Sequence, residues 1–391
     1  MINILNTLNR SSIEIAPLSQ DDGSEGQELL VIKRSENQLE KADQSLATMP
    51  NDANASVLAM IATQQKQVVL AMLGVNAEQA IALALASSIE IYAQKLEFIQ
   101  GWTNGGVEMF RSSLMLMFEN KKADGVQPTD LEDLFQLALL EIMCNPQEYG
   151  LESWYEQNKV DISHILESTG SGSHSLHETN WNTPQKLGAV VVKLYDSIMS
   201  NGKIPPDSFL GQIMQELAKA GGGKAISNQI VSGWTDDYGW WVNRGKPGSA
   251  TEISPMLRLF LLSSLLENKE MSKESVELIL TGSVDEIDAF VASEFDGQEG
   301  KYKSASLQWL IDHANWQMQD KHNTDQIDWI GDGIEIKELT KLYSEFPGRE
   351  LSEDELEEIN RIGDQVKMIQ QTLKYWLQIC KDEQLAIARN I

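Results

Sequence analysis

The chain has 391 residues, enough for two or three domains of ordinary size and a substantial apolar core. It carries 31 Lys and Arg against 58 Asp and Glu, a formal net charge of −27, and such a field repels nucleic-acid phosphates and anionic lipid headgroups. Apolar residues make up 42% and charged residues 23%, close to globular averages, so the chain as a whole is expected to fold. Nucleic acids and bare membrane surfaces are therefore not expected as partners.

The N-terminal residues, the cysteines and the longest apolar stretch narrow the class of protein further. Met1–Arg10 lacks the basic segment and the apolar segment of a Sec signal peptide. Cys144 and Cys380 are too few for a disulfide framework or a metal-ligand set, and we expect buried, reduced thiols. The apolar stretch Val57–Ile99 is interrupted by Gln, Lys and Glu well before the ~20 residues that a membrane span needs, which indicates a core helix.

Residues 1–55 are rich in Ser, Asn, Asp, Gln and Glu, a composition that predicts a flexible leader. Its apolar run Leu29–Ile32 is compatible with a short strand or a docking element. Residues 56–146 form a predicted helical region, because most of it is alanine-rich and free of proline, and it ends in an amphipathic helix over Leu131–Cys144. One stripe there recurs at spacings of four and three, as in a coiled-coil seam: Leu85, Ile89, Tyr92, Leu96 and Ile99.

Residues 147–349 change in character and predict a mixed, Trp-rich central lobe of short helices and loops, since Gly-Ser segments, prolines and tryptophans recur. A short β-hairpin is predicted between Asp325 and Ile336, around Asp332-Gly333. The predicted helices of this region are Thr183–Met199, Pro206–Ala220, Ser254–Glu267, Ser272–Leu280 and Val284–Glu294.

Residues 350–391 are expected to form one long helix. Ser352 and Glu355 make a capping box at its start, and the run that follows has no proline. Its apolar positions alternate at spacings of three and four: Ile359, Ile362, Val366, Ile369, Leu373, Trp376 and Cys380. Such a stripe fits either a coiled coil or an ordinary packed helix. We favour pairing with the helix of Leu85–Ile99, hence a mainly α fold in which a long helical hairpin, an intramolecular coiled coil, carries the central lobe.

No catalytic or cofactor motif emerges. Gly221–Ala225 lacks the first Gly and the Ser or Thr of a phosphate-binding loop. His164, His174 and His177 lack the HExxH arrangement, so we expect solvated loop histidines rather than metal ligands. Asp328–Leu339 has the central Gly of a calcium loop but apolar residues at ligand positions, and it is interpreted as a turn. We therefore expect no enzyme activity, metal or cofactor.

One aromatic group has two open interpretations. Trp234, Tyr238, Trp240, Trp241 and Arg244 either form a partner or ligand surface or plug the core of the lobe.

The tail, the polar leader and the mixed central lobe together resemble the hydrophilic translocators, or needle-tip proteins, of bacterial type III secretion systems. The residues that carry the resemblance are Glu358–Leu373, running on to Ile387–Ile391. Gly300–Ser306 is similar to a Lys-Tyr-x-Ser-x-Ser segment of some members.

The resemblance implies a dumbbell-like protein that is exported from the bacterial cytoplasm through the needle and assembles as a homo-oligomer at its tip. Its implied partners are the needle subunit and two hydrophobic translocators, whose insertion into a host membrane it supports. Needle contact and self-association would fall on Leu385, Ile387 and Ile391. Two other interpretations remain open: a secreted effector or enzyme with its site in the Trp-rich lobe, and an intracellular regulator, or gatekeeper, of secretion.

Overall fold

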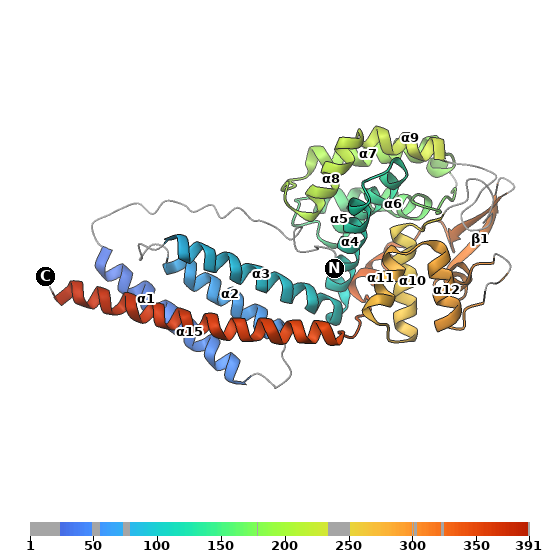
Figure 1. Cartoon of the computed structure of the whole chain (residues 1–391). Coiled ribbons are helices and arrows are strands. Elements are labelled where there is room, and N and C mark those ends of the chain that lie inside the picture. Colours follow the sequence, from blue (N-terminus) through green and yellow to red (C-terminus); the bar gives the residue numbers. More distant parts are fainter. Residues whose placement is uncertain are drawn as a thin grey trace. The chain divides into compact units, whose positions relative to one another are not determined.

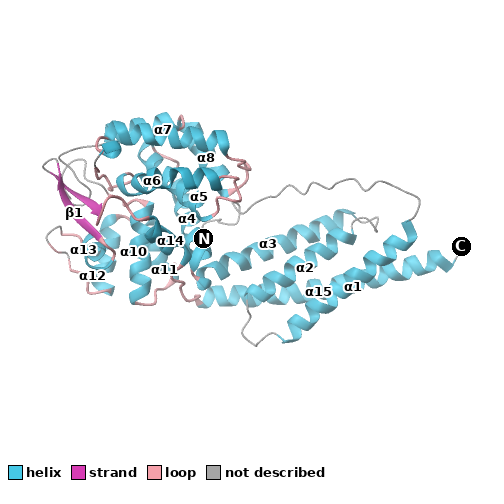
Figure 2. Ribbon diagram, turned by 180° about the vertical axis from the view of Figure 1, so that it is seen from behind, coloured by secondary structure: helices cyan, strands magenta, loops and turns pink. Residues whose placement is uncertain are grey.

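A computed structural model describes residues 24–48, 55–72, 79–177, 179–233, 251–298, 300, 303–321 and 324–389 (Figure 1). Helices dominate these residues, and the strands among them form one two-stranded antiparallel sheet (Figure 2). The predicted mainly α class with a short hairpin is confirmed. The chain divides into two compact units, here called the helical unit, residues 11–101 and 351–391, and the lobe, residues 102–350.

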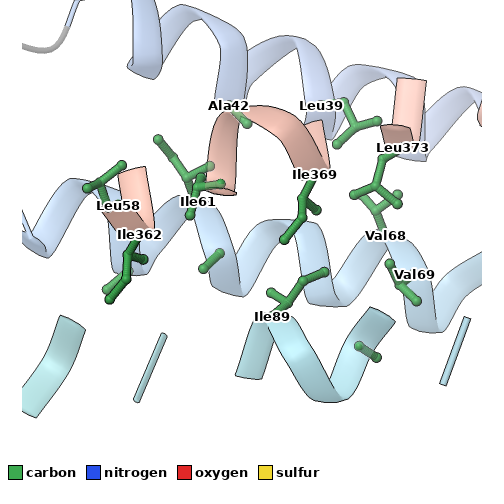
Figure 3. Close-up of a cluster of buried hydrophobic side chains, with 14 of the residues drawn as sticks. Leu39, Ala42, Leu58, Ile61, Val68, Val69, Ile89, Ile362, Ile369 and Leu373 are labelled. Carbon is green, nitrogen blue, oxygen red and sulfur yellow. The ribbon is translucent and has the colours of Figure 1, made fainter. Parts of the chain in front are cut away.

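The helical unit contains α1 (Ser24–Thr48), α2 (Ala55–Met72), α3 (Gln79–Asn104) and α15 (Glu353–Arg389). The last three residues of α3, after Gly101, are assigned to the lobe. The helices share one apolar cluster, to which each contributes the buried stripe of an amphipathic sequence (Figure 3). Its members include Ile32, Leu39, Ala42, Leu58, Ile61, Val68, Val69, Ile89, Leu96, Ile362, Ile369 and Leu373.

A polar link lies within this apolar cluster. The Gln370 side chain on α15 is buried, and its Nε2 donates to the Leu39 carbonyl of α1 at 2.6 Å. Its Oε1 accepts from Nε2 of buried Gln65 on α2 at 2.9 Å, and that same nitrogen donates to the Val366 carbonyl at 2.9 Å. Because unpaired polar groups are costly in an apolar interior, these bonds specify how three helices register on one another.

Two sequence predictions for this unit need correction. The leader predicted over residues 1–55 contains α1, so the strand interpretation of Leu29–Ile32 is wrong, while the alternative of a docking element agrees with the burial of Ile32. Its buried residues Ile32, Leu39 and Ala42 recur at helical spacing, and packing against α2 and α15 offsets the polar composition that suggested disorder. The predicted hairpin of two helices is also too simple, since α1 and α2 both pack on α15 and share its core with α3.

The lobe is built from many shorter elements. Its first half contains α4 (Gly106–Ala123), α5 (Leu131–Cys144), α6 (Glu152–Ser168), α7 (Pro184–Asn201), α8 (Phe209–Ala220) and α9 (Gly223–Gly233). Its second half contains α10 (Pro255–Asn268), α11 (Lys273–Thr281), α12 (Val284–Glu294), α13 (Ala305–His313), β1 (Trp316–Lys321), β2 (Thr324–Trp329) and α14 (Ile336–Ser344). The predicted boundary at residue 146 is therefore wrong, because α4 and α5 belong to the lobe.

Helix α5 lies at the centre of the lobe, with every residue from Leu131 to Met143 buried. Its buried polar side chains all have partners. Glu141 accepts hydrogen bonds from the Arg111 guanidinium at 2.6 and 3.0 Å and from the Tyr149 hydroxyl at 2.7 Å. The helix was predicted with the observed bounds, but as amphipathic rather than buried on all sides.

The predicted hairpin exists but is displaced. Strands β1 and β2 pair antiparallel with Trp316 opposite Trp329, so the hairpin precedes Asp332-Gly333, which lie in the turn after β2. The five helices predicted in this region correspond to α7, α8, α10, α11 and α12. Helices α6, α9, α13 and α14 were not predicted. In the segment with the Lys-Tyr-x-Ser pattern, the Ser304 side chain caps α13 by accepting a hydrogen bond from the Leu307 amide.

We predict that Gln370→Ala destabilises the protein by about 1–3 kcal/mol, because it removes the hydrogen bonds to Gln65 and Leu39 inside an apolar core. The matched control is Gln371→Ala at the next, exposed position, for which a change below about 0.5 kcal/mol is expected. Urea unfolding followed by circular dichroism measures both. Equal stabilities for the two variants would mean that the buried link contributes nothing.

Candidate functional site

The structure places both predicted seams in the interior of the helical unit. Each of their residues belongs to the apolar cluster or, as with Leu85, Tyr92 and Trp376, packs against it partly buried. Helices α3 and α15 are also joined by an ion pair, with Lys95 Nζ 3.1 Å from Glu358 Oε1. The stripes are thus core faces in a shared core, and a two-helix coiled coil does not describe them fully.

Several predicted surface residues lie outside the described part of the chain. This applies to Trp234, Tyr238, Trp240, Trp241 and Arg244, to Ile391 and to the side chain of Ile387. Leu385 is described, and 39% of it is exposed.

Helix α15 carries a second apolar stripe, on its outer side. Met368, Tyr375 and Ile379 are 60%, 71% and 37% exposed. At 100° per residue they fall within about 40° of one another, on the side of the helix away from Ile362, Val366 and Leu373. An apolar stripe on the outside of a helix whose inner face is already used is a candidate contact surface.

The lobe contains a buried polar cluster that sequence reasoning missed. His164 and Glu167 lie on α6, His177 follows a loop, and Asp328 lies on β2. His177 Nε2 is 2.9 Å from Glu167 Oε1 and 3.8 Å from Asp328 Oδ1, and the His164 and His177 rings meet edge to face with centroids 4.8 Å apart. His164, Glu167 and His177 each offer a ligand atom within 4.8 Å of the others.

Burial and mutual charge shift the pKa values of Asp328, His177 and His164. Burial, with the charge of Glu167 beside it, raises the pKa of Asp328 to about 7. Burial by itself would lower the pKa of His177, but its hydrogen bond to Glu167 and the nearby carboxylates raise it above the ordinary value. Burial and the neighbouring His177 lower the pKa of His164. The cluster therefore holds more negative charge than its interior position readily tolerates.

The prediction of solvated loop histidines is wrong for this cluster. His164 and His177 are buried, and His174, which is partly exposed, lies 3.2 Å from Glu132 Oε2. The error came from missing α6, since only a helix places His164 and Glu167, three residues apart, on one face. A usable signal existed in the helical spacing of Trp154, Tyr155, Asn158, Ile162, Ile165 and Leu166, all of which are buried.

A second group of carboxylates, Asp130, Asp133 and Glu252, also has oxygens within 4.8 Å of one another. The Lys121 ammonium occupies its centre, with Nζ at 2.8, 2.9 and 3.2 Å from the three residues. The three carboxylates outweigh burial and raise the pKa of Lys121 above its ordinary value, so a cation is already supplied by the chain.

Comparison of the chain with protein-family models, with curated proteins and with solved structures found no match. Among the described helices, none combines the length and the apolar character that crossing a bilayer requires.

We predict that Gly333→Ala destabilises the lobe more than Gly125→Ala. Both glycines have positive φ, +87° and +77°, so both variants carry backbone strain. A Cβ at Gly333 would lie 2.8 Å from His164 Cε1, whereas a Cβ at Gly125 meets nothing within 4 Å. The extra loss should be about 1–3 kcal/mol in chemical unfolding, and a variant pair of equal stability would contradict this packing of His164.

Proposed function

We propose that the protein is a non-enzymatic component of a bacterial type III secretion apparatus, exported through the needle and assembled at its tip, where it supports translocon insertion and effector delivery. The proposal rests on the resemblance of Glu358–Leu373 to needle-tip proteins. The structural observation that supports it is the outer stripe of α15, Met368, Tyr375 and Ile379. The inner face of the same helix packs in the core, so the outer stripe is free to contact a neighbour.

The expected partners are further copies of this chain, the needle subunit and the hydrophobic translocators. Aromatic and Met side chains are enriched where protein surfaces meet, and Tyr375 and Met368 are the most exposed large apolar residues of the described α15. The net charge of −27 opposes self-association at low ionic strength, so assembly of copies should strengthen as salt screens that repulsion.

Replacing Met368 and Tyr375 together by Ser should leave folding and export intact while reducing assembled protein at the needle tip and effector delivery by about tenfold or more, since both side chains contribute to contacts rather than to the core. Fractionation of the producing bacterium under secretion-inducing conditions, with tip labelling by antibody and an effector-delivery assay, measures these steps separately.

The matched control is Val160→Ser, a similarly exposed apolar residue on α6 in the lobe, which should leave assembly unchanged. A double variant that assembles and delivers effectors like the wild type would refute the role of the stripe. Wild-type protein retained in the cytoplasm would refute tip assembly itself and favour a gatekeeper or an enzyme.

A further inference from the structure

We propose that the buried cluster of His164, Glu167, His177 and Asp328 is a binding site for one zinc ion. The site lies wholly in the lobe and does not depend on the role proposed for the helical unit.

The first argument comes from buried atoms that lack partners. His164 Nδ1, Glu167 Oε2 and Asp328 Oδ1 are all inaccessible to solvent and make no hydrogen bond among the described residues. Each such atom costs about 1–3 kcal/mol. A proton shared between the two carboxyl groups would pair their oxygens but would leave His164 Nδ1 unpaired. A cation held by His164, Glu167 and His177, whose ligand atoms lie within 4.8 Å of one another, would also give the His164 imidazole a partner.

The second argument is that the other polar atoms of the carboxylates are already held. Glu167 Oε1 accepts from the Trp329 amide at 3.0 Å, and Asp328 Oδ2 accepts from Gln317 Nε2 at 3.1 Å. Each carboxylate is thus oriented by one oxygen, while its other oxygen accepts no hydrogen bond from another described side chain or amide. Such outer hydrogen bonds are the usual means by which proteins orient metal ligands.

The histidines are oriented as well. The His164 ring stacks on Trp181 with centroids 3.7 Å apart and planes 18° from parallel, and Gly333 lies against the ring. His177 Nδ1 lies 3.7 Å from the exposed Asp332 carboxylate, a suitable outer partner once Nε2 leaves Glu167 Oε1 and turns to the ion.

Charge and ligand type select the metal. Two carboxylates and two neutral imidazoles around a divalent ion give a site of zero net charge, which relieves the repulsion between Glu167 and Asp328. No Lys or Arg in the described part of the chain pairs with either carboxylate. The basic side chain beside both is His177, with Nε2 2.9 Å from Glu167 Oε1 and 3.8 Å from Asp328 Oδ1, and it would give up any proton on that nitrogen when it binds the ion. Two nitrogens and two oxygens suit Zn²⁺, while Ca²⁺ and Mg²⁺ prefer sets of oxygens only. Ligand atoms of tetrahedral zinc lie about 3.3 Å apart, whereas those of His164, Glu167 and His177 lie within 4.8 Å of one another, so the side chains must move closer when the ion binds.

The test uses the full chain, stripped with a chelator and dialysed. Titration calorimetry with Zn²⁺ should show one high-affinity site per chain, and Zn²⁺ should raise the melting temperature. Co²⁺ in place of Zn²⁺ should give the intense visible bands of a tetrahedral site, a readout that needs no variant. Absence of both the high-affinity site and the tetrahedral bands would overturn the proposal.

Variants locate the site. His177→Gln keeps a side chain able to donate to Glu167 and should weaken zinc binding about 100-fold, as should Asp328→Asn, which can still accept from Gln317. His174→Gln, the same change three residues away at a partly exposed position beside Glu132, should leave affinity within about twofold. Circular dichroism checks that each variant folds. Unchanged affinity in His177→Gln would overturn the assignment, because the ion would then be held by other carboxylates of this acidic chain.

Discussion

The lobe depends on a helix that has no exposed face. Every residue of α5 from Leu131 to Met143 is buried, and four of them carry polar or charged side chains: Glu132, Asp133, Gln136 and Glu141. A carboxylate left unpaired in such a place costs several kcal/mol, so each of these side chains requires donors brought from other elements. The polar groups of α5 therefore decide which loops can lie beside it, and the apolar residues supply the driving force without that selectivity.

The same helix orders the elements that carry the proposed zinc site. Gln136 Nε2 donates to the carbonyls of Leu166 and Thr169, which lie at the end of α6 where helical carbonyls lack partners. Glu132 and Asp133 accept from the amides of the loop that begins at Gly170 and leads to His177. One buried helix thus helps to position both the last turn of α6, with its glutamate, and the loop that leads to His177, in addition to the contacts that Glu167 and His177 make themselves.

How well the fold could be predicted depended on how local the information was. Helix α15 could be read from a capping box and an uninterrupted stripe within one segment, and the Ser352–Glu355 contacts are present, with Ser352 N donating to Glu355 Oε2 at 3.0 Å. Helix α1 has a similar stripe, Ile32, Leu39 and Ala42, but it is diluted by a polar composition that by itself indicates disorder. Burial of that stripe stabilises α1 only because other helices pack against it, and no pattern within residues 24–48 indicates that those helices are present.

The histidine cluster shows the same limit more severely. The Trp329 amide, next to Asp328 on β2, donates to Glu167, and these two residues are 162 positions apart in the sequence. No spacing rule relates residues so far apart. In the sequence, Asp328 begins a segment that is interpreted as a turn and the histidines are expected to be solvated, because each segment taken alone contains nothing that would bury them. The polar cluster forms only when β2 packs against α6. Burial then removes water from side chains that would each be solvated if the segments were separate. These residues differ from scattered polar residues because they lose their water together. Unpaired polar atoms from several elements then lie close enough to share one partner.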